Sequence, residues 1–264
     1  MLDFVYMSSY NVDDFRNIMN ILRSKDGCPW DREQTHTSIR RNLLEEAYEV
    51  CEAIDNEDAE HLKEELGDLL MQIIFHAQME EEIGSFNLDD VADRACQKLI
   101  LRHPHVFSDV KVDNADEVLK NWDDIKRKEK AQETVSSAMD GVAKSLPALW
   151  RAEKIQKKAQ KVGFDWPDIS GALSKLDEEL NEFHQAVEIN KGVEEELGDI
   201  LFAAVNAARF AGVDPEDALH KSCDKFTRRF RFIEKEAKLK GVDLDTMSLD
   251  EMETLYQQAK SREA

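Results

Sequence analysis

The chain reads LLEEAYEVCEAIDNEDAEHLKEELGDLL over residues 43–70, and it repeats this acidic pattern as LDEELNEFHQAVEINKGVEEELGDILF over residues 176–202. Each copy holds Glu-Glu-x-x-Glu, then a turn, then Glu-Leu-Gly-Asp. Carboxylates that are crowded together repel one another unless a cation lies between them. The repeat therefore predicts two helical hairpins, each with a site for a hard metal ion.

The spacing of the acids supports one site in each hairpin. Acids three residues apart lie on one face of a helix. Residues at the same level of an antiparallel hairpin have position numbers with a constant sum, and the facing acids of each copy obey this rule. The predicted metal ligands are Glu46, Glu49, Glu65 and Asp68 in the first copy, and Glu179, Glu182, Glu196 and Asp199 in the second.

Two other interpretations of these acids stay open. Glutamates on helices often form only a solvated face, although two copies with the same register weaken that interpretation. Di-iron bundles use Glu-x-x-His on two of their helices, whereas Asp68 and Asp199 stand where those histidines would be. An all-oxygen ligand set favours Mg²⁺, with Mn²⁺ as the alternative, over iron and zinc.

Composition narrows the classes of function. The 264 residues include 56 Asp and Glu against 35 Lys and Arg, which gives a formal net charge of −21. This charge argues against general binding to nucleic acid or to an anionic membrane surface. No apolar run approaches the length of a membrane span, and the first residues do not resemble a secretory signal. The four cysteines form no Cys-x-x-Cys pair and are interpreted as reduced thiols of a cytoplasmic protein.

The hydrophobic pattern predicts an all-α fold of tandem helical hairpins of the four-helix-bundle type. A turn is expected at residues 26–31, and the expected helices cover residues 12–25, 39–54, 59–82, 88–102, 115–132, 148–162, 169–188, 193–210, a stretch opened by Asp214-Pro215, and 249–260. The expected domains are residues 11–107 and 147–264, joined by a helical linker at 108–146. Because a hairpin cannot bury both of its faces alone, a homodimer that completes the bundles is expected.

Basic and aromatic residues follow the acidic motifs. Residues 225–229 read KFTRR, which places Lys225, Arg228 and Arg229 on one helix. Such a cluster suits phosphate oxygens, although basic residues near a helix end also pair with acids or complement the helix dipole. Trp30 and Trp166 stand at equivalent turns and are interpreted as packing anchors rather than base-stacking platforms.

Together these motifs resemble the MazG family of nucleoside triphosphate pyrophosphohydrolases. The similarity covers residues 11–261 in the two-repeat form of the family, and it rests on the acidic motifs and on GCPWD (27–31), QTH (34–36), RHPHVF (102–107), KIQK (154–157), VGFDW (162–166) and KFTRR (225–229). The resemblance implies an all-α, dimeric enzyme that uses Mg²⁺ to convert a nucleoside triphosphate to a monophosphate and pyrophosphate.

The resemblance also implies the nucleotide contacts. They are Lys175, Glu179, Glu195, Asp199, Lys225, Arg228, Arg229 and an aromatic near the C-terminus, Tyr256. The family usually has Trp at this last position, and Tyr256 is expected to stack with less area. Gly192 stands where a lysine is typical, with Lys191 beside it, so that lysine contact is left unassigned.

The expected reaction is in-line attack of a water molecule on the α-phosphorus, with pyrophosphate as the leaving group. Either Glu178 or Glu195 is expected to accept the proton of that water. Because only the second repeat has the full basic run, it is expected to carry most of the hydrolysis, and the first to be weak, selective or structural. Two alternatives stay open: a narrower enzyme for dUTP or an aberrant nucleotide, and a non-catalytic helical interaction module stabilised by metal.

Overall fold

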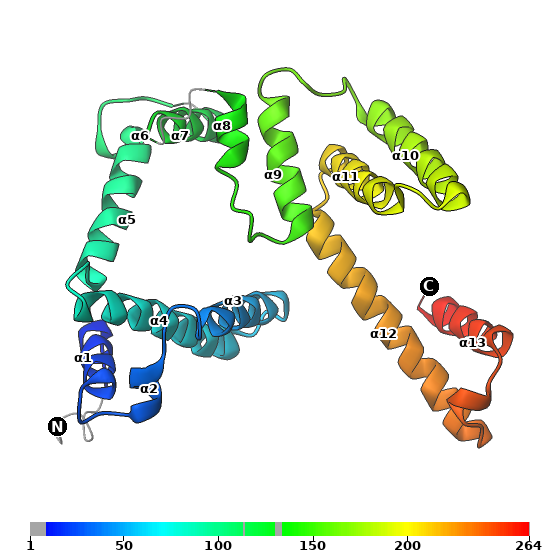
Figure 1. The fold of residues 1–264 in the computed structure, drawn as a ribbon, viewed down its shortest axis with the longest axis horizontal. Coiled ribbons are helices and arrows are strands. Elements are labelled where there is room, and N and C mark those ends of the chain that lie inside the picture. The colour runs from blue at the N-terminus through cyan, green and yellow to red at the C-terminus, as the bar shows by residue number, and fades with distance from the viewer. Residues whose placement is uncertain (1–8, 113, 130–133, 264) are drawn as a thin grey trace. The chain divides into compact units, whose positions relative to one another are not determined.

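The computed structural model describes residues 9–112, 114–129 and 134–263, and every regular element within these ranges is helical (Figure 1). The prediction of an all-α fold is therefore confirmed. Contacts divide the chain into two compact units that meet between Lys126 and Arg127, inside helix α7 (Ala115–Glu129). The finer boundaries of the predicted domains and linker stay predictions.

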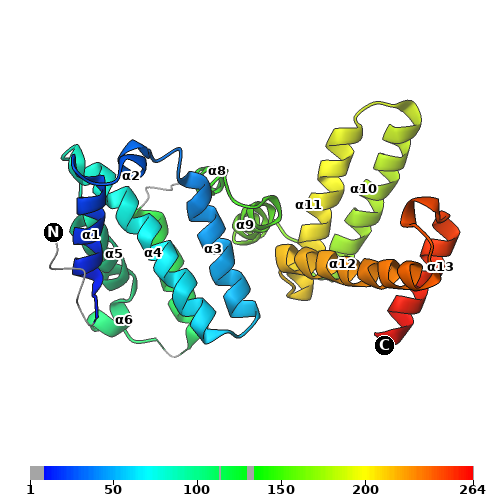
Figure 2. The ribbon, with the colours of Figure 1, turned by 90° about the horizontal axis from the view of Figure 1, so that it is seen from below.

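The first unit is built around the hairpin of α3 and α4, which lie side by side (Figure 2). Side chains at the helix starts explain where the helices begin. Asn11 and Asn87 form capping boxes, and Asp58 accepts hydrogen bonds from the first backbone amides of α4. The elements are α1 (Val12–Arg23), α2 (Pro29–Glu33), α3 (Arg40–Asp55), α4 (Ala59–Glu82), α5 (Leu88–Arg102) and α6 (Pro104–Phe107).

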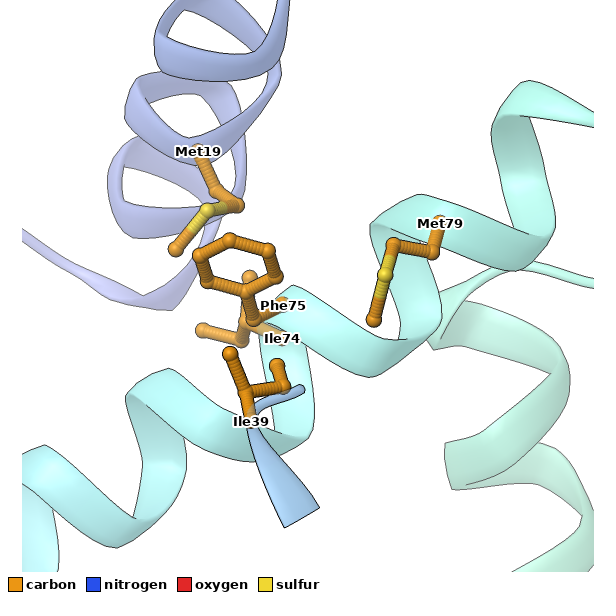
Figure 3. Packing of buried hydrophobic residues seen from close by; sticks show 5 residues of the cluster. All are labelled: Met19, Ile39, Ile74, Phe75 and Met79. Atoms are coloured by element: carbon orange, nitrogen blue, oxygen red, sulfur yellow. The ribbon is translucent and has the colours of Figure 1, made fainter. Parts of the chain in front are cut away.

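The core of the first unit forms where α1 packs on α4. Met19, Ile39, Ile74, Phe75 and Met79 are buried together, and Figure 3 shows Met19 beside the ring of Phe75. Full burial of a side chain such as Phe or Met stabilises a fold by about 1.5–3 kcal/mol. This cluster fixes α1 against the second helix of the acidic hairpin.

The second unit repeats this scheme with α9 packed on α11. Its acidic hairpin turns at Asn190 and Gly192, which have positive φ angles of 51° and 77°. Glycine adopts such an angle without strain because it has no Cβ. The elements are α8 (Val135–Asp140), α9 (Ala148–Gln160), α10 (Ile169–Ile189), α11 (Val193–Ala211), α12 (Pro215–Lys240), the 3₁₀ turn η1 (Leu244–Thr246) and α13 (Leu249–Arg262).

The two hairpins bury equivalent aliphatic residues. Ile74 follows the aspartate of the first Glu-Leu-Gly-Asp motif at the same spacing as Val205 follows the second. Each of these side chains is 1% exposed. The motif therefore aligns α4 with α11 residue by residue, which permits a direct comparison of the two sites.

Three short helices, α2, α6 and α8, and the 3₁₀ turn η1 are absent from the helices predicted from the sequence. α2 lies partly in the predicted turn at 26–31, because Pro29 stands at the first helical position, where its fixed φ angle favours a helix and its missing amide hydrogen is not needed. α8 lies in the predicted linker and is opened by a capping box of Thr134 and Ser137. The predicted helix 115–132 is observed from Ala115 to Glu129, and residues 130–132 lie outside the described ranges.

The predicted linker is attached to both units. Trp122 of α7 packs edge-on against His103, with ring centroids 4.8 Å apart, and lies under the guanidinium of Arg102. At the other end of the predicted linker, α8 packs against α9. Within the described ranges, no helix combines the length and the hydrophobicity needed to cross a membrane.

Candidate metal and nucleotide site

The first acidic cluster lies between α3 and α4. Glu46 and Glu49 of α3 and Glu65 of α4 each place a carboxylate oxygen within 4.8 Å of the others. Glu65 is buried, Glu46 is half-buried and Glu49 is exposed. Asp68, the fourth predicted ligand, lies outside this group, and its side chain is one methylene shorter than that of Glu.

Burial and neighbouring negative charges raise the pKa of Glu46. Burial is the largest cause, and the negative charges of Asp68, Glu49 and Glu65 add to it. A carboxyl group in these surroundings ionises less readily than one in water, and a nearby cation opposes that effect. The first cluster therefore holds repulsion that a divalent cation would relieve.

One basic side chain already contacts the first cluster. His61 lies one turn before Glu65 on α4, and its Nε2 is 2.9 Å from a carboxylate oxygen of Glu65. The sequence analysis missed this contact, although the i, i+4 spacing of the two residues is the signal that predicts it. The partner of the buried acid in the first hairpin is thus an imidazole.

The second acidic cluster lies between α10 and α11. Glu179 of α10 and Glu196 and Asp199 of α11 each place one oxygen within 4.8 Å of the others. The buried acid is now Glu179, on the first helix of the hairpin rather than the second. Glu182 is exposed and lies outside this group. Burial, followed by the charge of Glu182, raises the pKa of Glu196.

A lysine contacts the second cluster. Nζ of Lys175 lies 2.7 Å from an oxygen of Glu178 and 2.7 Å from an oxygen of Glu179. These hydrogen bonds, the one to Glu178 first, raise the pKa of Lys175, so its ammonium group stays charged at neutral pH. The equivalent position in the first hairpin is Asn42. The second cluster therefore has a fixed positive charge that the first cluster lacks.

The donor atoms of both clusters fit a hard metal ion. Each hairpin brings three predicted ligands together, and all of them offer carboxylate oxygens. Oxygen-only donor sets suit hard divalent cations better than the nitrogen- and sulfur-preferring metals. A bound cation would offset the burial and the neighbouring negative charges that raise the pKa values of Glu46 and Glu196.

The arginines predicted to bind phosphate are paired with the acid that directly follows α13. Nε of Arg228 and Nε of Arg229 each lie 2.8 Å from a different carboxylate oxygen of Glu263. The arginines lower the pKa of Glu263. Lys225 is exposed on the same helix. Within the described ranges, no hydrogen bond or ion pair joins these cations to the acidic cluster, and no sequence signal predicts Glu263 as their partner.

Tyr256 lies beside the same arginines. Its ring is 5.5 Å from the guanidinium carbon of Arg229 and 5.9 Å from the ring centroid of Phe226. Tyr256 and Glu263 together raise the pKa of Arg229. The aromatic residue predicted to stack on a base is therefore engaged in the contact between α12 and α13.

The two predicted proton acceptors have different surroundings. Glu178 already accepts a hydrogen bond from Lys175. Glu195 is exposed in the first turn of α11, and no ion pair holds it within the described part of the chain. Glu195 is therefore the more accessible of the two to a water molecule.

The two tryptophans that were interpreted as packing anchors have different surroundings in the structure. Trp30 is 60% exposed, so that interpretation is wrong for Trp30. Trp166 packs against Gly171, where an added Cβ would come within 2.8 Å of the ring, yet it is still 45% exposed. The free part of Trp166 lines a cavity of about 440 Å³ in the second unit.

Comparison with known proteins gives consistent matches. Residues 34–107 and 169–232 match the sequence model of the MazG nucleotide pyrophosphohydrolase domain. The chain is 46% identical over 257 residues to the nucleoside triphosphate pyrophosphohydrolase of Escherichia coli (strain K12), covering 96% of this chain and 98% of that protein. It is 43% identical over 248 residues to the nucleoside triphosphate pyrophosphohydrolase/pyrophosphatase MazG of Thermotoga maritima, covering 94% and 95%. It is 50% identical over 252 residues to YabN of Bacillus subtilis, covering 94% of this chain and 51% of that protein.

Proposed function

The chain belongs to the MazG nucleotide pyrophosphohydrolase family, and on that premise we propose that it hydrolyses nucleoside triphosphates to monophosphates and pyrophosphate with Mg²⁺ as its cofactor. The observation that carries the proposal is the cluster of Glu179, Glu196 and Asp199. Its crowded carboxylates favour a hard cation, and the cation in turn attracts a triphosphate that a bare acidic surface would repel. Housekeeping of nucleotide pools is the role that fits this chemistry.

Each predicted ligand would offer a carboxylate oxygen to the metal, with Asp68 and Glu182 joining the three acids that each hairpin already brings together. The set is Glu179, Glu182, Glu196 and Asp199 in the second hairpin, and Glu46, Glu49, Glu65 and Asp68 in the first. When bound, Mg²⁺ would neutralise phosphate charge and activate a water molecule. Glu195 would take the proton of the attacking water, with Glu178 as the second candidate.

The cations of the second unit would hold the phosphates. Lys175 would move its hydrogen bonds from Glu178 and Glu179 to a phosphate oxygen once a metal neutralises the acids. Lys225, Arg228 and Arg229 would bind the β- and γ-phosphates. The carboxylate of Glu263 already accepts hydrogen bonds from both guanidinium groups, so the two arginines have the geometry to bind an oxyanion. Tyr256 remains the residue predicted to stack on the base.

We further propose a homodimer. Three apolar side chains are exposed along α10 at intervals of seven residues: Leu173, Leu180 and Val187. Apolar residues at this spacing typically pack against another helix. Leu197 and Leu201 of α11 are exposed as well. A second copy packed on this hairpin would complete a four-helix bundle. Light scattering of the wild type against a Leu173→Lys, Val187→Lys double variant tests the dimer, and a monomeric wild type would refute it.

A cytoplasmic location is part of the proposal. All four cysteines are free thiols, and free thiols suit a reducing compartment. The formal net charge of −21 also argues against a nucleic-acid partner.

Product analysis tests the function. A panel of ribo- and deoxyribonucleoside triphosphates that includes ATP and dUTP is incubated with Mg²⁺ and with wild type, Glu179→Ala or Glu188→Ala. Glu188 is an exposed acid of α10 outside the cluster, so it is the matched control. We expect monophosphate and pyrophosphate from the wild type and the control, and loss of both products in Glu179→Ala.

Other outcomes point elsewhere. Orthophosphate plus diphosphate would mean that a different bond is cleaved. Turnover of a single nucleotide would favour the narrower enzyme. No turnover of any triphosphate, together with a rise in melting temperature on adding Mg²⁺, would favour the metal-stabilised interaction module.

A further inference from the structure

Two histidines of the first unit are in close contact, away from the acidic clusters. Nδ1 of His36, in the segment before α3, lies 2.7 Å from Nδ1 of His76 on α4, and the two ring planes differ by 4°. Two nitrogens that bind one tetrahedral Zn²⁺ lie about 3.3 Å apart, so the shorter contact indicates a hydrogen bond. Nε2 of His36 lies 2.7 Å from a carboxylate oxygen of Glu80, one turn further along α4. The three side chains therefore tie the segment before α3 to α4.

The contacts fix the position of each proton in this chain of side chains. An ionised carboxylate only accepts hydrogen bonds, so Nε2 of His36 donates to Glu80. A neutral imidazole has one donor and one acceptor nitrogen, so Nδ1 of His36 accepts from Nδ1 of His76. Nε2 of His76 then carries no proton. This atom is buried and has no hydrogen-bond partner among the described residues.

An added proton has no favourable place in this arrangement. On Nε2 of His76 it creates a positive charge and a buried N–H group without an acceptor. On Nδ1 of His36 it faces the hydrogen of His76 across 2.7 Å, unless His76 moves its own proton to the same buried nitrogen. Burial, followed by the charge of His36, lowers the pKa of His76 from its ordinary value of 6.5. The closed arrangement therefore favours neutral imidazoles.

Charged groups of the elements packed around the pair form contacts of their own. Arg23 of α1 donates from Nε and Nη2 to the carboxylate of Glu82 on α4, at 2.7 and 2.8 Å, and from Nη1 to the carbonyl of Gln34 at 3.3 Å. Three further contacts join Arg16 of α1 to Asp89 of α5, Arg41 to Glu45 within α3, and Arg32 of α2 to the carbonyl of Lys25. Of the neighbouring charges, that of His36 is the one that affects the pKa of His76.

The second repeat has alanine at both of the equivalent helix positions. Alignment of the Glu-Leu-Gly-Asp motifs places Ala207 of α11 at the position of His76, and Ala211 at the position of Glu80. Alanine has no polar group that could hold the preceding segment. The arrangement is therefore a feature of the first repeat.

The segment that the histidines hold leads into the acidic hairpin. Ile39 follows His36 by three residues, and its side chain is buried in the core with Phe75, the neighbour of His76. α3 begins at the next residue and carries the two acids that it contributes to the first cluster. Release of His36 from α4 would therefore loosen the start of α3.

We propose that His36, His76 and Glu80 form a pH-sensitive clasp, which holds the start of α3 on α4 at neutral pH and opens on acidification. Protons reach the clasp through His36, whose side chain is 49% exposed. The open form takes up a proton more readily, because both imidazoles then reach water. The stability that the clasp contributes is complete above the ordinary pKa of 6.5, and it is lost as the pH falls toward the lowered pKa of His76. This response to acid is independent of the proposed function.

Hydrogen–deuterium exchange of the full chain tests the opening. The backbone amides of Ile39 and Leu43 donate to carbonyls at the start of α3, so their protection factors report on the clasp. We expect these factors to fall at least about tenfold between about pH 7.5 and pH 5.5 in the wild type. His76→Asn keeps an N–H donor for His36 but does not titrate in this range, so its factors should change less than about threefold.

A matched control separates the clasp from other effects of acid. His220→Asn removes an exposed imidazole of α12 and should behave like the wild type. The acidic clusters are the same in all three proteins, so their titration cannot produce the expected difference. An equal fall in the wild type and in His76→Asn would overturn the proposal.

Nitrogen NMR of histidine-labelled wild type tests the proton positions without any variant. At about pH 7.5 we expect a proton on Nε2 of His36 and on Nδ1 of His76. The titration midpoint of His76 should lie below that of the exposed His220. The opposite tautomers, or a His76 that titrates together with His220, would also refute the clasp.

Discussion

The two acidic hairpins carry the same acids in different charge environments. In the first hairpin the buried acid is Glu65 of α4, and it contacts His61. In the second hairpin the buried acid is Glu179 of α10, and it contacts Lys175. The basic partner is an imidazole in one repeat and an ammonium group in the other. Repetition of the ligands therefore does not repeat the electrostatics of the site.

The largest expected difference between the hairpins is in catalysis. Glu179→Gln should lower kcat/KM by about 1,000-fold. Residues that only hydrogen-bond to a metal ligand affect activity by about 10–100-fold, and the loss of a ligand itself should have a larger effect. Glu46→Gln should cost less than about threefold if the first hairpin is weak or structural. Steady-state rates of pyrophosphate release measure both variants. Equal losses would end the claim that the second repeat dominates.

The next comparison concerns packing beside the hairpins. Met19 is buried in the core of the first unit, so Met19→Ala should lower the free energy of unfolding by about 2–5 kcal/mol. Ile155 of α9 precedes Trp166 by eleven residues, as Met19 precedes Trp30. It borders the open cavity, so Ile155→Ala should cost less than about 2 kcal/mol. Urea unfolding of the full chain measures each loss. A larger loss for Ile155→Ala would mean that the cavity closes in solution.

Exchanging the residues at positions 42 and 175 tests the role of the lysine. Lys175→Asn should lower the free energy of unfolding of the metal-free protein by about 1 kcal/mol, a figure reduced for the partial exposure of Lys175. Because folding raises the pKa of Lys175, its ammonium group contributes its full stabilisation at every pH below its unfolded pKa. The substitution should therefore remove this whole contribution at pH 7. Asn42→Lys should add a basic partner to the first cluster and weaken its affinity for Mg²⁺. Titration calorimetry of Mg²⁺ would contradict this account if Asn42→Lys bound the ion more tightly.

The smallest expected effect is the response of both clusters to pH. The pKa values of Glu46 and Glu196 are raised, so their ionised forms destabilise the metal-free fold, and this destabilisation disappears as the pH falls through those pKa values. Mg²⁺ competes with protons for the same oxygens. The rise in melting temperature on adding Mg²⁺ should therefore be about 2–4 °C larger at pH 8 than at pH 5. Thermal melts of Glu46→Gln and Glu196→Gln would assign the rise to one hairpin or to both, and a rise that grows on acidification would exclude carboxylate ligands.

Most of the fold could be predicted from local signals in the sequence. The bounds of α4 and α5 were predicted to the residue, because Asp58, Gly84 and Asn87 mark where helices begin and end. The short helices α2 and α8 were missed, since a proline or a Thr-Ser capping pair also occurs in turns. Local signals therefore fix long helices better than single turns of helix.

The acidic residues of the candidate site could be predicted better than the residues around them. The register of the acids gave the members of both clusters, because helical periodicity brings them to facing sides of a hairpin. The pairing of Arg228 and Arg229 with Glu263 depends on how α13 folds back on α12, which no local pattern encodes. The cavity was not predicted, because it depends on how side chains from separate segments pack together. The short side chain of Asn206 at the position equivalent to Phe75 was a signal for it in the sequence.

Each basic partner lies four residues before the acid that it contacts, on the same helix: His61 before Glu65, and Lys175 before Glu179. Such a pair is encoded by five consecutive residues and needs nothing from the facing helix. For protein design, the basic residue that compensates the buried acid can thus be transferred with a short segment of one helix. Moving it between hairpins would exchange an imidazole for an ammonium group beside the buried acid and leave every acid of the cluster in place.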